Sequence, residues 1–125
     1  MRVLIVDGAN VVGSRPTGWW RDRAGAARRL HSELAAAALD VDEVVLVLEG
    51  AAKAGYLAGT ADGIRTVHAP GSGDDAIVDQ VRSSVADGHQ VMVVTADRGL
   101  RSRVTAAGGS YVGPSWLTER TSGSG

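Results

Sequence analysis

Cysteine is absent from the 125-residue chain. Without thiols there are no disulfides, no zinc sites built on thiolates, no iron-sulfur clusters and no cysteine nucleophile. A chain of this length buries roughly two-thirds of the surface that it exposes when unfolded, so one hydrophobic core holds it without such cross-links. The absence of cysteine therefore excludes several chemistries but is compatible with a stable single domain.

Long hydrophobic runs are also missing. The apolar runs Val3–Val6, Val44–Leu48 and Val91–Val94 are far shorter than the ~20 residues that a membrane helix requires. Met1 and Arg2 lead directly into the first run, without the charged and apolar regions of a signal peptide. We therefore expect a soluble, cytoplasmic protein with no membrane partner.

Neither sign of charge dominates, since 13 basic residues face 14 acidic ones and the formal net charge is -1. A markedly basic composition, the usual sign of nucleic-acid binding, is thus lacking. The total nevertheless averages two separate groups. Arginines gather in residues 15–29, where Asp22 is the one acid, and in residues 98–103, whereas aspartates stand at positions 7, 74, 75, 79 and 97. Cations bound at the aspartates would offset their charge and leave the arginines to meet phosphate.

The apolar runs alternate with segments of helical spacing, which predicts a parallel sheet covered by helices on both faces. The expected strands are Val3–Val6, Glu43–Leu48, Ile64–His68, Val91–Thr95 and Ser110–Val112. The expected helices are Arg23–Leu39, a short one at Ala51–Leu57, Asp74–Ala86 and Arg98–Ala107. We expect one domain over residues 1–117, with Trp116 packed on it, and a flexible tail over residues 118–125.

Acidic residues follow the predicted strands. In open α/β sheets the ligand site lies beyond the carboxyl ends of the strands. Carboxylates that converge there repel one another and favour a hard divalent cation, Mg²⁺ or Mn²⁺. Asp75 and Asp79 are four residues apart and so share one face of their helix. The acids at these positions are Asp7, Glu49, Asp74, Asp75 and Asp97.

Each acid also has a purely structural interpretation. Ser72 with Asp75 matches a capping box, Asp97 is suited to cap the next helix, and Asp7 before a glycine is ordinary turn chemistry. Asp79 lies beyond the capping turn, where the alternative is a solvated helix face. It is the joint position of these residues at strand ends that favours a site.

The residues Val6-Asp7-Gly8-Ala9-Asn10, followed by Trp20 and Asp22, resemble the opening of the NYN branch of PIN-like ribonucleases, which includes the YacP-like proteins. The resemblance continues through Leu48-Glu49-Gly50, where relatives usually have aspartate before the glycine. It then takes in Gly73-Asp74-Asp75-Ala76-Ile77-Val78-Asp79 and Thr95-Ala96-Asp97-Arg98. These motifs stand in the family's order and cover the chain to about Trp116.

This resemblance implies a PIN-like α/β/α sandwich and metal-dependent hydrolysis of RNA. The metal-binding carboxylates would be Asp7, Asp75 and Asp97, with Asp79 as a fourth acid and Asn10 as a polar positioning residue. Asp74 competes with Asp75 for the ligand role, and helical phase with Asp79 favours Asp75. The role of Glu49 stays open.

The planar guanidinium group of arginine donates paired hydrogen bonds to phosphate, and an indole ring can stack on an unpaired base. The substrate-binding candidates are Arg98, Arg15, Arg101 and Trp20, with Trp19 available as a second ring. The alternative for each is a solvated arginine or a tryptophan packed on the core.

Other α/β enzymes fit less well. A haloacid dehalogenase phosphatase needs an aspartate at Ala9, a receiver domain needs an acidic pair at Asp7-Gly8, and no nucleotide-binding glycine loop follows the first strand. The main alternative is an RNA-binding or protein-interaction module without catalysis. The sequence leaves open the RNA substrate, endonucleolytic or exonucleolytic cleavage, the number of metal ions and a homodimer.

Overall fold

The structure is a computed structural model that describes residues 1–122. Its strands are β1 (Arg2–Asp7), β2 (Glu43–Leu48), β3 (Gly59–Ala61), β4 (Ile64–His68), β5 (Gln90–Val94) and β6 (Ser110–Val112). Its helices are α1 (Gly8–Gly13), α2 (Arg23–Ala36), α3 (Gly73–Ala86), α4 (Arg98–Ala106) and α5 (Pro114–Ser122). Two 3₁₀ helices complete it, η1 (Trp19–Arg21) and η2 (Gly50–Gly55).

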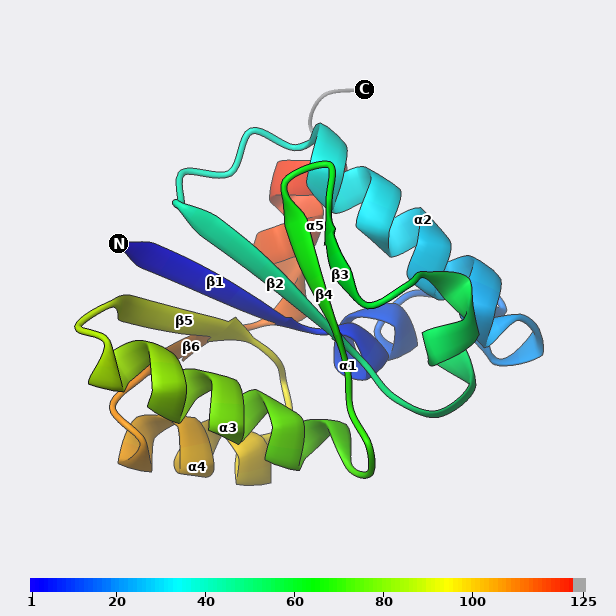
Figure 1. The fold of residues 1–125 in the computed structure, drawn as a ribbon. Coiled ribbons are helices and arrows are strands. Elements are labelled where there is room, and N and C mark those ends of the chain that lie inside the picture. The colour runs from blue at the N-terminus through cyan, green and yellow to red at the C-terminus, as the bar shows by residue number, and fades with distance from the viewer. Residues whose placement is uncertain (123–125) are drawn as a thin grey trace.

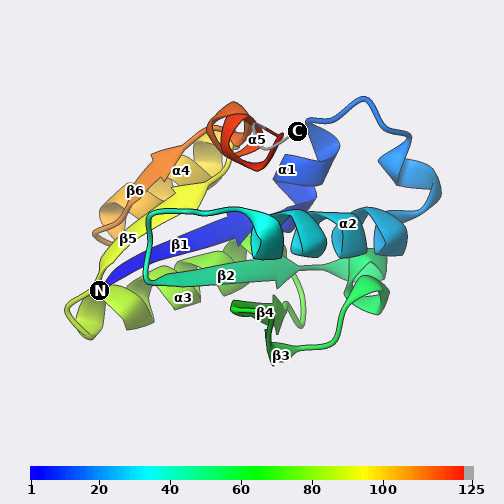
Figure 2. The ribbon, with the colours of Figure 1, turned by 90° about the horizontal axis from the view of Figure 1, so that it is seen from above.

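The described residues form a six-stranded sheet in the order β3-β4-β2-β1-β5-β6 (Figure 1). Neighbouring strands pair in parallel, except that β3 runs antiparallel to β4 at one edge. Helices cover both faces of the sheet, with α1, α2 and α5 on one face and α3 and α4 on the other (Figure 2). The predicted α/β/α sandwich with a mostly parallel sheet is confirmed.

Both faces of β1 are buried, which explains its unbroken apolar run. Successive side chains of a strand point to opposite faces. Leu4 and Val6 accordingly pack with α1, α2 and α5, while Val3 and Ile5 pack with α3 and α4. The same division holds along β2 and β5, so each strand of the centre contributes to two cores.

The predicted helices and strands exist, but some ends differ. The helix predicted to reach Leu39 ends at Ala36, because Ala37 takes an extended backbone that lets Leu39 and Val41 pack on the core. The segment predicted as a short helix at Ala51–Leu57 is the 3₁₀ helix η2. Neither β3 nor α1 was predicted, since three and six residues are too short to show a hydrophobic period.

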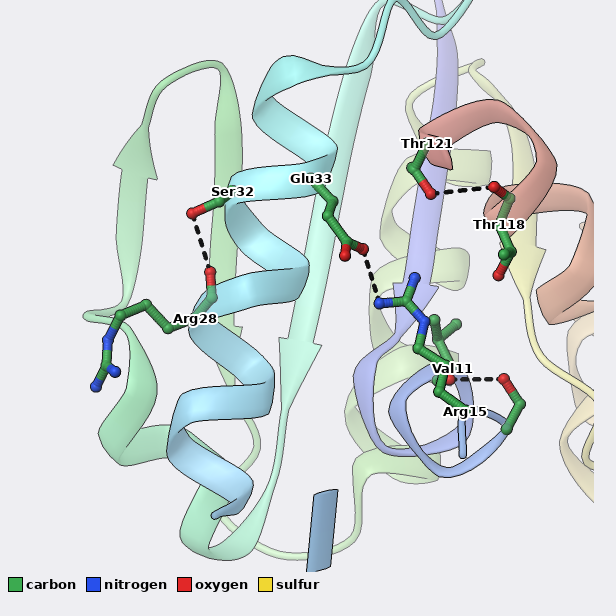
Figure 3. A network of polar contacts seen from close by, with 8 residues as sticks. Val11, Arg15, Arg28, Ser32, Glu33, Thr118 and Thr121 are labelled. Atoms are coloured by element: carbon green, nitrogen blue, oxygen red, sulfur yellow. Dashed lines mark hydrogen bonds and ion pairs between the residues drawn. The ribbon is translucent and has the colours of Figure 1, made fainter. Parts of the chain in front are cut away.

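The carboxyl-terminal segment corrects another expectation. The tail was expected to begin at residue 118, but residues 118–122 complete α5. Leu117 is fully buried, the guanidinium of Arg120 stacks 4.0 Å from the centre of the Trp116 ring, and the Thr121 hydroxyl donates to the Thr118 carbonyl (Figure 3). Leu117 and Trp116 pack on the core and hold the helix against the body, while the other two contacts lie within the helix. Residues 123–125 of the expected tail lie outside the described residues. No helix within residues 1–122 is long and apolar enough to cross a membrane.

The contact of η2 with α2 provides a test of this packing. A Cβ atom at Gly55 would overlap the carbonyl oxygen of Ala24, which is backbone and has little room to move. We expect Gly55→Ala to lower the free energy of unfolding by roughly 1–3 kcal/mol in a denaturant titration, the usual cost of overpacking. Gly71→Ala is the control, because its Cβ would meet nothing within 4 Å. Equal stability of the two variants would show that η2 does not pack on α2 in this way.

Candidate active site

The carboxyl ends of three adjacent parallel strands bring polar residues to one edge of the sheet. Asp7 is the last residue of β1, while Glu49 and Thr95 directly follow β2 and β5. β1 lies between β2 and β5, at the point where the chain order along the sheet changes direction. Open α/β sheets bind their ligands in the crevice at such a point.

Asp7 is held by hydrogen bonds from two different segments. The Thr95 hydroxyl donates to Asp7 Oδ2 at 2.9 Å, and the Asn10 backbone N–H donates to Asp7 Oδ1 at 3.4 Å. The Asn10 side-chain oxygen in turn accepts from the Ala96 N–H at 2.8 Å, and Thr95 Oγ1 accepts from the Asp97 N–H at 3.2 Å. This network ties the end of β1 and helix α1 to the loop between β5 and α4.

Burial raises the pKa of Asp7 to about 6, although the hydrogen bonds from Thr95 and Asn10 oppose this shift. The side chain is 6% exposed, so its charged form has lost most of its water. The negative charges of Asp74 and Glu49 raise the pKa of Asp7 further. This carboxyl is therefore half-ionised at about pH 6, where an ordinary aspartate is already fully charged.

Asp74 experiences the same electrostatic environment. Partial burial raises its pKa, and the charges of Asp97 and Glu49 add to the shift while Arg103 opposes it. The charges of Glu49 and Asp74 thus act on Asp7, and those of Glu49 and Asp97 act on Asp74. We call these four residues the acid cluster.

Two members of the acid cluster also have structural roles. Glu49 Oε2 accepts from the Gly73 N–H at 2.7 Å and so connects the end of β2 to the start of α3. Asp97 Oδ1 accepts from the Leu100 N–H at 2.8 Å and caps α4. The cap that the sequence allowed for Asp97 is therefore present, together with the proximity to Asp74.

Asp75 and Asp79 are not among the charges that act on Asp7, although the charge of Asp75 raises the pKa of the adjacent Asp74. The Asp75 carboxylate forms an ion pair of 2.9 Å with Arg103 on the protein surface. Asp79 is exposed one turn further along α3 and lines a cavity of about 270 Å³ with Asp75 and His68. Their predicted roles as metal ligand and fourth acid stay predictions, whereas the charge coupling to Asp7 belongs to Asp74.

The donor chemistry of the acid cluster suits a hard divalent cation. Four carboxylates offer anionic oxygens, and the buried charge of Asp7 gains from a nearby positive charge. Within residues 1–122 no three acidic or histidine side chains converge closely enough to hold a metal ion by themselves. Magnesium is usually held by one or two carboxylates with water and substrate phosphate, so the cluster fits such an ion.

Positive charge borders the acid cluster on the side of β5 and β6. Arg101 donates from Nε to the Thr95 carbonyl at 2.9 Å, and its guanidinium lies 4.5 Å from the centre of the Tyr111 ring. Exposed Arg98 joins them around an open cavity of about 660 Å³. Two of the predicted substrate-binding residues, Arg98 and Arg101, thus lie beside Asp97 on the same helix.

The other two substrate-binding candidates lie differently. Arg15 forms an ion pair of 2.7 Å with Glu33 of α2 (Figure 3). Trp20 is 57% exposed, and its ring meets the edge of Trp19 at 6.0 Å between centres. Trp19, which the sequence offered as a second ring, lines a cavity that includes Glu49 of the acid cluster.

Comparison with solved structures finds a protein of similar fold. A mutant of Rae1 (YacP) from Bacillus subtilis superposes with a TM-score of 0.79 and 18% sequence identity, over 98% of this chain and 76% of that chain. The fold is YacP-like. No protein-family model matches the chain, and the search of curated proteins finds no match. Membership of the NYN branch therefore stays a prediction, while the expected architecture is confirmed.

Thr95 is the site residue that sequence reasoning missed. It stood within the Thr95-Ala96-Asp97 motif, but no role was assigned to it. The sequence feature that could have identified Thr95 is its position directly after an apolar run. A residue that directly follows a strand lies at the edge of the sheet where ligands bind. In the structure Thr95 is fully buried and links two acids of the cluster, Asp7 and Asp97.

The raised pKa of Asp7 predicts how stability depends on pH. An acid whose pKa is higher in the folded state than in the unfolded state destabilises the fold when it ionises, and this penalty disappears as pH falls through about 6 towards 4. We expect Asp7→Asn to be more stable than the wild type by roughly 2 kcal/mol at pH 7.5 and nearly equal to it at pH 4, measured by denaturant titration.

Thr95→Val provides a matched control, since it keeps the shape of the side chain but removes the hydroxyl that donates to Asp7. The pKa of Asp7 should then rise further, and the wild-type change in stability should move to higher pH. A constant difference between Asp7→Asn and the wild type from pH 4 to 7.5 would contradict the assignment.

Proposed function

We propose that the chain is a divalent-metal-dependent ribonuclease that hydrolyses RNA phosphodiester bonds at the acid cluster. The observation that carries the proposal is the buried carboxyl of Asp7, which shares the field of Glu49 and Asp74 at the ligand edge of the sheet. Acids with a purely structural role rarely keep a buried charge without a positive partner. Acids whose pKa values are strongly shifted cluster at functional sites. The YacP-like fold and the motifs that resemble PIN-like ribonucleases support the same reaction class.

We infer that Asp7 and Asp74 would hold the cation, with Asp97 and Glu49 completing its surroundings. Asp74 replaces Asp75 in this role because its charge acts on Asp7, whereas Asp75 pairs with Arg103. Bound Mg²⁺ or Mn²⁺ lowers the pKa of water and neutralises phosphate oxygens. Several acids near one another favour such an ion over an empty site.

In the proposed hydrolysis a water oxygen attacks phosphorus, one ester P–O bond breaks, and the departing oxygen takes up a proton. Asp7 is kept in place by Thr95 and Asn10, so its carboxylate needs no rearrangement to meet the cation. Arg98 and Arg101 bind phosphates of the strand that leads to the site.

One observation favours the alternative, an RNA-binding module of the same fold without catalysis. Glu49 and Asp97 already serve as hydrogen-bond acceptors for Gly73 and Leu100. In a module of this kind the acids would cap helices, and the arginines and aromatic rings would bind RNA without cleaving it. Activity and cation binding separate the two functions.

For activity, the informative variants keep the fold and change one charge. Asp97→Asn retains a side-chain oxygen that can cap α4. We expect Asp97→Asn and Asp74→Asn to lower cleavage of single-stranded RNA in Mn²⁺ by roughly a hundredfold or more, the scale on which a preorganised electrostatic group acts. Asp75→Asn, the adjacent control, should retain most of the activity. Full activity of Asp97→Asn would exclude this site, and loss in Asp75→Asn with activity in Asp74→Asn would return the role to Asp75.

For cation binding, a ligand that binds the folded state raises the unfolding temperature. We expect Mn²⁺ to raise the Tm of the wild type and of Asp75→Asn by several degrees at saturation. Asp7→Asn and Asp74→Asn should show no such rise, because each removes a proposed ligand. If the wild type shows no rise that depends on these residues, the binding module is the better description.

A further inference from the structure

A cavity of about 390 Å³ lies next to the acid cluster, on the side of β2. Its lining residues come from α1, η1, the beginning of α2, and the connection from β2 into η2. Helix α2 packs against both α1 and η2, and α1 and α2 lie next to each other in Figure 1. Glu49 belongs to the wall of this cavity and also to the acid cluster. A molecule in the cavity would therefore be a direct neighbour of a phosphodiester at Asp7.

The walls of the cavity combine one flat ring with small residues. Trp19 is half-buried, and the guanidinium of Arg23 lies 5.3 Å from the centre of its ring. Most of the remaining lining is glycine, alanine and short aliphatic side chains, namely Gly8, Ala9, Val12, Ala27, Gly50 and Ala52. The cavity is thus bounded by an aromatic surface and apolar walls, with one positive and one negative group.

This lining selects the chemistry of its occupant. The apolar walls and the indole ring favour a flat ring system. The Glu49 carboxylate accepts hydrogen bonds and so needs N–H donors on the edge of that ring. The positive charge of Arg23 favours an occupant whose ring system carries an anionic group. An RNA nucleotide with an unpaired base satisfies all three conditions, since its base is flat, its edge carries N–H groups and its phosphate is anionic.

We propose that this cavity binds one unpaired base of the RNA, beside the phosphodiester that is cleaved. The inference rests on the proposed function for its RNA substrate, and it assigns the base contact to Trp19 rather than to the exposed Trp20. A paired base has its N–H edge covered by its partner, so the site takes single-stranded RNA.

Glu49 gives the cavity a preference among bases. Guanine offers two adjacent N–H donors, at N1 and at the exocyclic amino group, which match Oε1 of Glu49 and the acceptor position that Oε2 keeps beside its hydrogen bond from Gly73. Uracil presents a single ring N–H flanked by two carbonyl oxygens, which the carboxylate repels. Guanine is therefore the best occupant and uracil the poorest.

The test measures binding without hydrolysis. The full chain carrying Asp97→Asn is titrated, in EDTA, into fluorescently labelled single-stranded RNA hexamers, and Kd is read from anisotropy. Each hexamer carries one abasic position, which moves along the strand. We expect one position at which loss of the base weakens binding roughly tenfold, the scale of one stacked base. At that position guanine should bind most tightly and uracil most weakly.

Three variants then connect this position to the cavity. Trp19→Leu removes the ring, and Ala9→Phe fills the cavity from the exposed side of α1 without removing any packing. In both, the intact and abasic strands should bind equally. Trp20→Leu is the matched control and should keep the tenfold difference. Because Ala9→Phe deletes nothing, it remains informative if Trp19→Leu fails to fold.

The inference is overturned if no abasic position changes Kd by more than about twofold, or if the difference persists in Ala9→Phe. The outcome is independent of catalysis, because the assay contains no divalent cation. Base-dependent binding without any metal-dependent cleavage would retain the cavity assignment and reject the nuclease. Cleavage by the wild type without base-dependent binding would do the opposite.

Discussion

The buried carboxyl of Asp7 is the constraint around which the ligand edge of this protein is built. The sheet carries it to the end of the central strand, where little water reaches it. Its stabilising hydrogen bonds come from Asn10, in the helix α1 that follows β1, and from Thr95, 88 residues away and directly after β5. The same two residues also hold the loop before α4, through the N–H groups of Ala96 and Asp97. The geometry of the whole edge therefore depends on keeping one acid in place.

This arrangement stores unfavourable electrostatic energy. Asp7 is desolvated and lies in the field of Glu49 and Asp74, and both hydrogen bonds to it only partly offset the cost. A proton or a cation relieves the repulsion, whereas a hydrophobic residue would have avoided it entirely. Proteins keep such local costs where activity requires them, and the surrounding cores supply the compensating stability. The two cores on either side of β1 bury alternate side chains, and together they bury all of Val3–Val6. This packing stabilises the strand that carries the Asp7 carboxylate.

The sequence predicted the elements that have a long hydrophobic pattern. It did not predict features that depend on how a helix is oriented on the sheet. The apolar strands and the acids that follow them were visible because burial on two faces leaves no polar alternation. The choice between Asp74 and Asp75 was not, because a spacing of four identifies a shared helix face but not which face meets the sheet edge. In the structure Ser72 caps α3 and Asp75 accepts from Arg103 of the neighbouring helix, and the choice between the two acids as ligand stays a prediction. Short α1 and the role of Thr95 depend on contacts between distant segments, which no local pattern records.

For the RNA substrate that we propose, the strand order sets a path across the site. The cavity with Trp19 lies at the end of β2, the acid cluster surrounds the end of β1, and Arg98 and Arg101 stand at the ends of β5 and β6. These strands are consecutive in the sheet, so a single strand laid over its carboxyl edge meets an aromatic site, then acids, then cations. Arg15 and Arg103 are engaged by Glu33 and Asp75, so the basic segments of the sequence do not form one continuous surface. Affinity then depends on a base contact and a few phosphates rather than on bulk charge, which reconciles an RNA substrate with a net charge of -1.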